Sequence, residues 1–375
     1  MSKKILKIVI IVNKLSGGGA ERVAALWATG FVEKGYNVTV LISETINNFG
    51  YNISKKVCVK YIGLILRNST LSALSKKIGI SRWYYKRRLY KELQKIKPDI
   101  CIGVLGNNAL DAYKATRNLN TIVIQTEHNA YDRPDFLKSR SEIIKRKFKT
   151  NRIFDCVTVL SKADTLVKDV PTENMVVLPN PLTFNPIQEI GTRDNTILAV
   201  GRLDSWYIKG FDNLINAWGK IAKKYPNWKL QIAGTGSLKS QLYLQNLVKI
   251  NNINSQIEFL GYCKDVCSLY RKTSVFVLSS RYEGFGMVLT EAMSQGCACI
   301  ACDFGGRQKE IITTEKQGII CTNDNINELV KAIEKMIVDS DYRESCREPA
   351  IERSGYYSLE NTILRWEQLF NKLIN

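Results

Sequence analysis

Short apolar runs alternate with segments of helical periodicity along this chain, and this alternation limits the possible folds more than any other feature. The first apolar run, 7–12, is followed by a glycine-rich turn at 16–19, a helical segment at 20–34 and a second run at 37–42. Further strands are predicted at 99–104, 121–125 and 155–160. Strands separated by helices form parallel sheets with helices packed on their faces, so the pattern predicts an α/β fold.

The same pattern stops and then starts again in the middle of the chain. Leu178-Pro179-Asn180-Pro181 ends the first series, and polar sequence follows through Arg193. The second series of predicted strands comprises 196–201, 229–233, 256–260, 274–278 and 297–301. A chain of 375 residues also exceeds what one core usually supports. We therefore predict two doubly wound domains, 1–182 and 183–356. Ligands of such sheets bind beyond the carboxyl ends of the strands, so two facing domains would form an interdomain cleft.

Charge is distributed unevenly between the two predicted domains. The formal net charge is +19; residues 1–182 carry 31 Lys and Arg against 14 Asp and Glu, whereas residues 183–375 carry 23 against 21. The excess in the first domain therefore indicates what that domain faces, which could be anionic lipid, nucleic acid or an anionic substrate.

Cysteines and apolar stretches bear on the compartment. The ten cysteines lie mostly in apolar runs, and the chain has one histidine and no pair of Cys-x-x-Cys motifs, so buried free thiols are favoured over a metal site. Free thiols are typical of a reducing cytoplasm. Asn13 and Lys14 interrupt the first apolar run, which favours a buried strand over a signal peptide. No apolar stretch reaches the roughly 20 residues that span a bilayer, so we expect a soluble or peripheral protein.

The densest chemical signal is the segment 279–293, which follows a predicted strand. Gly284 and Gly286 allow a close backbone approach to a ligand, and the helix that begins behind them offers N–H groups to an anion. Glu283 and Glu291 are eight residues apart, too far along a helix to form a carboxylate dyad. Two separate hydrogen-bonding roles fit this spacing better, and a plain loop before an amphipathic helix is the alternative.

A second motif follows the strand at 196–201. Arg202 offers a fork of N–H donors suited to phosphate oxygens, and Lys209 adds a compact positive charge in the same loop region. Placement after a strand and a glycine favours contact with a ligand, and solvated surface cations are the alternative. The single Asp-x-Asp sequence, 339–341, lies far from these motifs beside a predicted helix end, where helix capping is the better interpretation.

Two weaker signals lie in the first domain. Ser16-Gly17-Gly18-Gly19-Ala20-Glu21-Arg22 lacks the Gly-x-Gly-x-x-Gly fingerprint, but a glycine-rich turn between strand and helix can still hold an anion. His128 lies among polar residues just after the strand at 121–125, at the position expected for a ligand site. A plain turn and a structural histidine are the alternatives.

These motifs together resemble the retaining glycosyltransferases of family 4, which have the GT-B fold. The resemblance rests on Glu283-x7-Glu291 within Glu-Gly-Phe-Gly, on the Arg202 and Lys209 loop, and on Gly-Gly-Ala-Glu-Arg after the first strand. It implies that Glu283 contacts the hydroxyls of the donor sugar and that Glu291 contacts the ribose. It also implies that Arg202 and Lys209 bind the diphosphate.

Other positions are assigned by the same resemblance. His128 is expected to hydrogen-bond the donor sugar, and Asn180 to line the cleft. The remaining residues expected near the donor are Gly18, Gly19, Gly261, Tyr262, Gly284, Phe285, Gly286, Met287 and Val288. The C-terminal segment 357–375 has apolar residues at helical spacing and is expected to return to the first domain. Many relatives carry Gly-Pro where this chain has Arg307 and Gln308, which weakens the transfer of donor specificity at that loop.

The excess positive charge is concentrated in two segments of the first domain. Residues 76–97 contain nine Lys and Arg with one acid, interleaved with Trp83, Tyr84, Tyr85 and Tyr90, and residues 138–152 contain seven with one acid. A basic helix with aromatic residues at its edge suits an anionic membrane surface. A solvated helix face and single-stranded nucleic acid are the alternatives, and the transferase motifs favour lipid over nucleic acid.

We therefore expect a hexosyltransferase-type enzyme that acts with retention. Its donor would be a nucleotide-sugar, with UDP-sugars favoured, and its acceptor a glycan or a polyprenyl-diphosphate-linked glycan of cell-surface polysaccharide synthesis. Neither metal nor cofactor is expected, and the location would be the cytoplasmic face of the membrane. An epimerase acting on nucleotide-sugars with the same fold and a basic nucleic-acid-binding protein are the alternatives.

Overall fold

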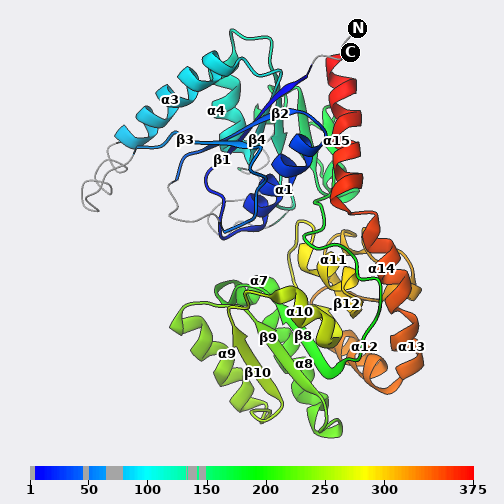
Figure 1. Ribbon diagram of the computed structural model, residues 1–375. Helices are drawn as coiled ribbons and strands as arrows, with labels where there is room; N and C mark the ends of the chain where they lie inside the picture. Colours follow the sequence, from blue (N-terminus) through cyan, green and yellow to red (C-terminus); the bar gives the residue numbers. More distant parts are fainter. Residues whose placement is uncertain (1–4, 45–49, 65–78, 132, 134–141, 143–148) are drawn as a thin grey trace. The chain divides into compact units, whose positions relative to one another are not determined.

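The computed structural model describes residues 5–44, 50–64, 79–131, 133, 142 and 149–375 (Figure 1). The chain divides into two compact units. Unit 1 comprises Met1–Pro181 with Leu359–Asn375, and unit 2 comprises Leu182–Ser358. The change of unit thus falls within the Pro-Asn-Pro segment that interrupts the strand pattern.

Unit 1 is built around a parallel sheet in the order β3-β2-β1-β4-β5-β6-β7. Its strands are β1 (Lys7–Val12), β2 (Asn37–Ile42), β3 (Cys58–Tyr61), β4 (Ile100–Val104), β5 (Ile122–Thr126), β6 (Cys156–Val159) and β7 (Met175–Val177). Its helices are α1 (Gly19–Glu33), α3 (Ile80–Ile96), α4 (Gly106–Thr116), α6 (Lys162–Thr165) and α15 (Leu359–Ile374). The order reverses between β1 and β4, which places the switch point of the sheet there.

Helices cover both faces of this sheet. Val9 and Ile11 of β1 belong to one apolar cluster with residues of α3 and α4. Because side chains alternate along a strand, Ile8 and Ile10 point to the opposite face, which α1 covers. The central strands are therefore buried on both faces, as near-continuous apolar runs require.

The C-terminal helix α15 lies beside α1 (Figure 1). Aromatic side chains of the two helices are in contact. Trp366 lies edge-on to Trp27, with ring centroids 5.1 Å apart, and Phe370 lies 5.4 Å from Phe31. Ile363 contacts Gly30 so closely that a Cβ at this glycine would lie 2.5 Å from the isoleucine side chain. These contacts explain why the last helix of the chain belongs to unit 1.

Unit 2 contains a six-stranded parallel sheet in the order β10-β9-β8-β11-β12-β13. Its strands are β8 (Asp194–Val200), β9 (Lys229–Ala233), β10 (Ile257–Gly261), β11 (Thr273–Leu278), β12 (Ala298–Asp303) and β13 (Ile319–Thr322). Its α-helices are α7 (Trp206–Lys209), α8 (Phe211–Ile221), α9 (Leu238–Ile250), α10 (Val266–Lys272), α11 (Met287–Ser294), α12 (Ile326–Val338), α13 (Ser340–Ser345) and α14 (Arg347–Gly355). Short 3₁₀ turns lie at Leu203–Ser205, Ala222–Lys224, Gln308–Glu310 and Glu315–Gln317. The order of this sheet reverses between β8 and β11.

These two sheets confirm the predicted α/β class with two doubly wound, Rossmann-like sheets. Three strands were missed: β3, β7 and β13 are only three or four residues long and lie at or next to sheet edges, so they lack a long apolar run. Asp339 caps α13 by accepting a hydrogen bond from the Tyr342 N–H at 2.9 Å, in agreement with the capping interpretation. Among the described residues, no helix combines the length and apolar character needed to cross a membrane.

Candidate functional site

The switch point of the unit 2 sheet lies between β8 and β11, whose strand-end loops carry two of the predicted motifs. Arg202 and Lys209 follow β8, and Glu283 follows β11. Because β8 and β11 are neighbours and parallel, their carboxyl ends lie at the same edge of the sheet. Open α/β sheets bind ligands at this position.

Lys209 and Glu283 meet at this edge although 74 residues separate them. The Lys209 ammonium donates to Glu283 Oε1 at 2.5 Å, and the Ser280 hydroxyl donates to the same oxygen at 2.8 Å. Their side chains are 23% and 13% exposed, so the pair is partly accessible to a ligand. An ammonium and a carboxylate are therefore held side by side, and each is available to one part of an ionic, hydroxyl-rich ligand.

Glu291 lies on α11, and each of its two carboxylate oxygens accepts a hydrogen bond. The Thr183 hydroxyl donates to its Oε1 at 2.6 Å, and the Tyr270 hydroxyl donates to its Oε2 at 3.2 Å. Glu291 is only 2% exposed. A ligand hydroxyl can thus reach this carboxylate only by replacing one of these neighbours. Neither partner could be predicted from the sequence. Thr183 and Tyr270 belong to none of the motifs, and Thr183 lies 108 residues from Glu291.

The N-terminal end of α11 supports the predicted backbone contacts of this segment. Gly286 precedes the helix with φ +93°, a conformation that favours glycine, and a Cβ there would lie 3.1 Å from the Leu278 side chain. Met287 and Val288 occupy the first turn, where helix N–H groups favour an anion. Phe285 differs in that its ring is buried and lies 5.2 Å from that of Tyr357, so only its backbone is suited to a ligand.

The loop after β8 contacts a second glycine-rich loop that the sequence analysis did not single out. Gly201 N–H donates to Ala233 O at 2.9 Å, and Leu203 N–H donates to Thr235 O at 2.8 Å. A Cβ at Gly234 would lie 1.8 Å from Gly201 O, so the two loops touch backbone to backbone. This loop could have been predicted from the sequence, because Gly-x-Gly-Ser directly follows the predicted strand 229–233.

Arg202 and Tyr262 are both exposed at the ends of their strands. Arg202 forms no ion pair with any residue in the described part of the chain, and Tyr262 is 79% exposed after Gly261, which has φ +67°. Their positions leave both side chains accessible to a ligand at the carboxyl edge.

His128 follows β5 in unit 1 and packs on an aromatic ring. Its ring centroid lies 5.6 Å from that of Trp27, and Nε2 is hydrogen-bonded to Thr126 Oγ1 at 3.0 Å. Burial lowers the pKa of His128 to about 4, and the neighbouring buried side chain of Asn180 acts in the opposite direction. His128 is therefore a neutral imidazole near pH 7, and Asn180 is its neighbour as well as part of the interrupting segment.

Gly18 and Gly19 lie where β1 is followed by α1. Gly18 is the N-cap residue in extended conformation, and a Cβ there would lie 2.1 Å from the Glu21 carboxylate. Gly18 O accepts a hydrogen bond from the Tyr51 hydroxyl at 2.8 Å. The turn is thus held tightly at the switch-point edge of the unit 1 sheet, beside β4.

Comparison with protein families accounts for nearly the whole chain. A model described as glycosyltransferase family 4 matches residues 17–183, and a model described as glycosyl transferases group 1 matches residues 183–353. An uncharacterized glycosyltransferase of Haemophilus influenzae is 30% identical over 363 residues, covering 95% of this chain and 97% of that protein. The chain belongs to glycosyltransferase family 4.

A further relative and a solved structure are also similar to this chain. A Campylobacter jejuni protein named GalNAc-α-(1→4)-GalNAc-α-(1→3)-diNAcBac-PP-undecaprenol α-1,4-N-acetyl-D-galactosaminyltransferase is 25% identical over 377 residues, covering 99% of this chain and 100% of that protein. A TarM variant from Staphylococcus aureus, solved with fondaparinux, α-GlcNAc-glycerol and UDP, is 15% identical with a TM-score of 0.79, covering 98% of this chain and 100% of that one. The latter likeness concerns the fold and confirms GT-B.

One loop departs from the pattern of many family 4 members. Arg307 and Gln308 replace Gly-Pro, and both are buried, at 2% and 0% exposure. Gln308 accepts a hydrogen bond from Phe304 N–H at 2.7 Å, and the Arg307 guanidinium lies 4.9 Å from the centre of the Phe304 ring. Both side chains are thus used to fold the loop after β12.

The basic segment 76–97 is only partly solvated. Within α3, Trp83 is 59% exposed and Tyr90 46% exposed, as a surface-binding face requires, whereas Arg82 donates to buried Asp111 at 2.8 Å. The prediction of an interfacial aromatic was wrong for Tyr85, which is 6% exposed and belongs to the apolar core, where burial strongly raises its pKa. Residues 76–78 and most of 138–152 lie outside the described residues.

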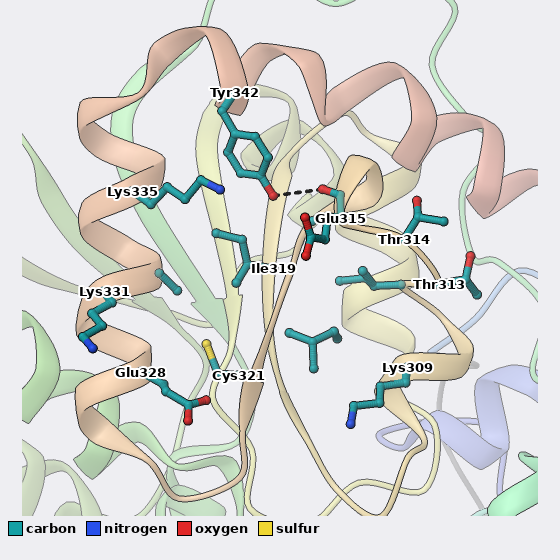
Figure 2. Close-up of a pocket in the computed structure, with 14 residues that line it drawn as sticks. Lys309, Thr313, Thr314, Glu315, Ile319, Cys321, Glu328, Lys331, Lys335 and Tyr342 are labelled. Carbon is teal, nitrogen blue, oxygen red and sulfur yellow. Dashed lines mark hydrogen bonds between the residues drawn. The ribbon is translucent and has the colours of Figure 1, made fainter.

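A hollow of about 590 Å³ lies away from all of these residues, along the edge strand β13 (Figure 2). Lys331 and Lys335 of α12 lie on one side of it and Thr313 on the other, with Ile319 between them. None of the predicted site residues lines it. Its rim is closed by internal contacts, such as the Tyr342 hydroxyl donating to Glu315 O at 2.9 Å. We therefore assign no function in the reaction to this hollow.

The cysteines form no metal centre in the part of the chain that the structure describes. All ten are free thiols, and seven of them are buried. Burial raises the pKa of Cys297, Cys302 and Cys321 to about 12, which leaves these thiols protonated and unreactive. Among the described residues, no three His, Cys, Asp or Glu side chains lie together in a way that could hold a metal ion.

Proposed function

We propose that this chain transfers a sugar from a UDP-sugar to a hydroxyl of a glycan carried on polyprenyl diphosphate, in bacterial cell-surface glycan synthesis. Unit 2 binds the donor and unit 1 the acceptor in this proposal. The observation that supports it most is the meeting of Lys209 and Glu283 at the switch point of the unit 2 sheet, beside the N-terminal end of α11.

The diphosphate of the donor requires positive charge at this edge. Arg202 is exposed and Lys209 is partly accessible, so both can bind phosphate oxygens. The amides of Met287 and Val288 add the partial charge of a helix N-terminus. These fixed groups can stabilise the leaving diphosphate, and the proposed reaction needs no metal ion.

The two glutamates bind hydroxyl groups of the donor. Glu283 binds the sugar, because its carboxylate is partly exposed and already accepts hydrogen bonds from Lys209 and Ser280. Glu291 binds the ribose, whose hydroxyls replace Thr183 as hydrogen-bond donors. Both carboxylates accept hydrogen bonds from protein groups, so donor binding exchanges one set of hydrogen bonds for another.

The transfer itself proceeds with retention at the anomeric carbon. The bond between this carbon and the diphosphate oxygen breaks, and the acceptor oxygen forms its bond on the same face of the sugar. The leaving phosphate oxygen takes the acceptor proton, so no protein carboxylate is needed as a nucleophile. Neutral His128, oriented by Trp27 and Thr126, hydrogen-bonds the sugar from unit 1.

The acceptor assignment is supported by the name of the Campylobacter jejuni relative, which acts on an undecaprenyl-diphosphate-linked glycan. A lipid-linked acceptor requires the enzyme to work at the membrane surface. The exposed Trp83 and Tyr90 of α3, with its lysines and arginines, provide a face that suits the anionic cytoplasmic leaflet. The segment 138–152 adds to the positive charge through its sequence.

A transfer assay with a panel of UDP-, GDP- and ADP-sugars and a pool of polyprenyl-diphosphate-linked glycans tests the activity. We expect one donor to yield a lipid-linked product whose mass increases by one sugar, with unchanged rate in excess EDTA and an anomeric configuration equal to that of the donor. Inversion, or a loss of rate in EDTA that magnesium restores, would contradict the mechanism. Consumption of donor without acceptor would identify an epimerase and contradict transfer.

A flotation assay tests the membrane proposal separately. Binding to vesicles should rise with the fraction of anionic lipid and fall as salt is added, because charge attraction is screened. Binding that is indifferent to both would exclude it. Salt-sensitive binding to oligonucleotides that is undisturbed by UDP-sugars would favour a nucleic-acid-binding protein instead.

A further inference from the structure

Arg281 lies two residues before Glu283 and is almost fully buried, with 7% exposure. All five N–H groups of its guanidinium have an acceptor. Nε donates to Asp324 Oδ1 at 2.7 Å, Nη1 donates to Asp212 Oδ1 at 2.7 Å and to Tyr207 O at 2.8 Å, and Nη2 donates to Asp212 Oδ2 at 2.9 Å and to Asn213 Oδ1 at 2.7 Å. The Tyr207 ring also lies 4.4 Å from the guanidinium carbon.

These acceptors come from three separate segments of unit 2. Tyr207 lies on α7, Asp212 and Asn213 lie in the first turn of α8, and Asp324 lies in the turn before α12. The acceptors also bond to one another, because Asn213 Nδ2 donates to Asp324 Oδ1 at 2.6 Å. Arg281 is therefore the centre of a closed hydrogen-bond network rather than one half of a single ion pair.

The backbone of Arg281 connects the same segments a second time. Its N–H donates to Ile208 O at 2.8 Å, and its carbonyl accepts from Asn323 Nδ2 at 2.8 Å. Next to it, the Ser279 hydroxyl donates to Lys209 O at 2.9 Å. Gly210, with φ +63°, lies so close that a Cβ there would be 1.9 Å from Ser279 O.

This network holds the two segments that carry the Lys209–Glu283 pair. α7 ends at Lys209, and Glu283 follows Arg281 by two residues, so both side chains extend from backbone that the guanidinium and its neighbours fix. Neither Asp212 nor Asp324 contacts Lys209 or Glu283 directly through any bond among the described residues. The network therefore supports the backbone that carries Lys209 and Glu283 and does not bond to their side chains.

We propose that Arg281 is a positioning residue for sugar transfer: with Asp212 and Asp324 as its acceptors, it sets the separation of the Lys209 ammonium and the Glu283 carboxylate. This inference rests on the proposed function of that pair. The planar fork of five donors is essential to the role, because it reaches three segments at once. A lysine retains the charge but offers three donors from one atom and cannot bridge these segments.

The charges of the network agree with this role. Burial alone would lower the pKa of Arg281, but the carboxylates of Asp212 and Asp324 raise it above the usual value. The hydrogen bond from Asn213 and the interactions with Arg281 lower the pKa of Asp324. Arg281 and Asp324 are thus ionised at neutral pH, and loss of the arginine would leave the side chains of Asp212 and Asp324 without the guanidinium that bridges them.

The first test compares Arg281→Lys with Arg347→Lys in the full-length enzyme. Arg347 is a matched control, because it is 1% exposed and donates to Glu344 at 2.7 and 3.0 Å and to Gly296 O at 2.6 Å, but contacts neither α7 nor residues 279–283. Measurements are made at a temperature where circular dichroism shows both variants folded. The readouts are kcat for transfer and the calorimetric Kd for UDP.

We expect Arg281→Lys to lower kcat about 100-fold, the scale of a misplacement of roughly 1 Å, while the UDP Kd changes less than about threefold. Arg347→Lys should lower the melting temperature but change kcat less than about threefold. Equal kcat in the two variants would overturn the proposal, since a merely structural arginine affects only the folded fraction.

Chemical rescue provides a second, independent test if Arg281→Lys does not fold. Arg281→Ala is assayed with and without millimolar guanidinium chloride, which can occupy the vacated position. A rise in kcat with guanidinium, absent with ammonium chloride and absent in the wild type, is expected. No rescue in a folded variant would contradict positioning by the fork. If wild-type protein transfers no sugar from any nucleotide-sugar, the proposed function fails rather than this inference.

Discussion

The carboxyl edges of the two sheets carry polar side chains of different kinds. In unit 2, the carboxylates of Glu283 and Glu291 accept hydrogen bonds from other protein groups, and the Lys209 ammonium is the donor to Glu283. In unit 1, His128 is kept neutral by burial and lies against the ring of Trp27. The first edge thus carries an ion pair, and the second a buried neutral ring.

This difference follows from what each edge is proposed to bind. A diphosphate carries charge that must be matched, so the unit 2 edge needs cations that internal partners hold until the ligand arrives. A sugar hydroxyl is neutral, and a neutral imidazole can bind it without the cost of removing a charge from water. The effects of substitutions on sugar transfer should therefore differ in magnitude between the two edges, and so should their pH dependence.

The largest effect is expected at the ionic pair. Glu283→Ala and Lys209→Ala should each lower kcat/KM for transfer by about 1,000-fold, because each removes a charged group proposed to act on the sugar or the diphosphate. Initial rates with saturating acceptor measure this. Glu258→Ala is the matched control, because Glu258 is an exposed glutamate of the same unit whose side chain accepts a hydrogen bond from Gln231 of β9. Wild-type turnover in either site variant would remove the pair from the mechanism.

A smaller loss is expected at His128. His128→Phe keeps an aromatic ring against Trp27 but removes the hydrogen bond to the donor, and we expect transfer to fall about 30-fold, within the range for one hydrogen bond to a bound ligand in a buried site. Unchanged tryptophan fluorescence would show that the packing is retained. If the rate were unaffected, His128 would be a structural residue only.

The pH dependence separates the two edges further. His128 is the single histidine, so NMR of its imidazole follows its titration without overlap. Its folded pKa of about 4 lies below the unfolded value near 6.5, so the neutral form is favoured by folding. Its contribution to stability is therefore complete above about pH 6.5 and is lost as the pH falls from there towards 4. An imidazole that titrates near 6.5 in the folded protein would contradict this.

The smallest effect is expected at the hydroxyl that occupies Glu291. Thr183→Val removes the group that competes with the ribose for Glu291 Oε1. One hydrogen bond contributes about 1 kcal/mol, so calorimetry should show UDP bound about fivefold more tightly. Weaker binding would mean that Thr183 orients Glu291 instead of competing with the ligand.

The sequence predicted the fold and the individual motifs better than their connections. The apolar runs located most strands, and each of Arg202, His128 and Glu283 was placed at a strand end, where the structure has it. The hydrogen-bond partners of Glu291 and Arg281 could not be predicted, because Thr183 and Asp324 are distant in sequence and become neighbours only through the sheet order.

The burial of Tyr85 could have been predicted from the helical spacing of the sequence. Tyr85, Leu89 and Leu93 recur at the spacing of one helix face and are all buried, so the helical period already separated Tyr85 from the exposed Trp83 and Tyr90. The prediction for the segment 76–97 rested on its aromatic content and not on the helix face that each aromatic residue occupies. Short edge strands such as β13 were missed for a different reason, since four residues hardly establish a pattern.

The central claim is that unit 2 holds a nucleotide diphosphate at the switch point of its sheet. A crystal structure of the protein grown with UDP tests it directly. The account predicts phosphate density against Lys209, Arg202 and the N-terminal turn of α11, with Glu291 hydrogen-bonded to the ribose. Ordered UDP anywhere else on the chain, with the Lys209–Glu283 pair undisturbed, would contradict it.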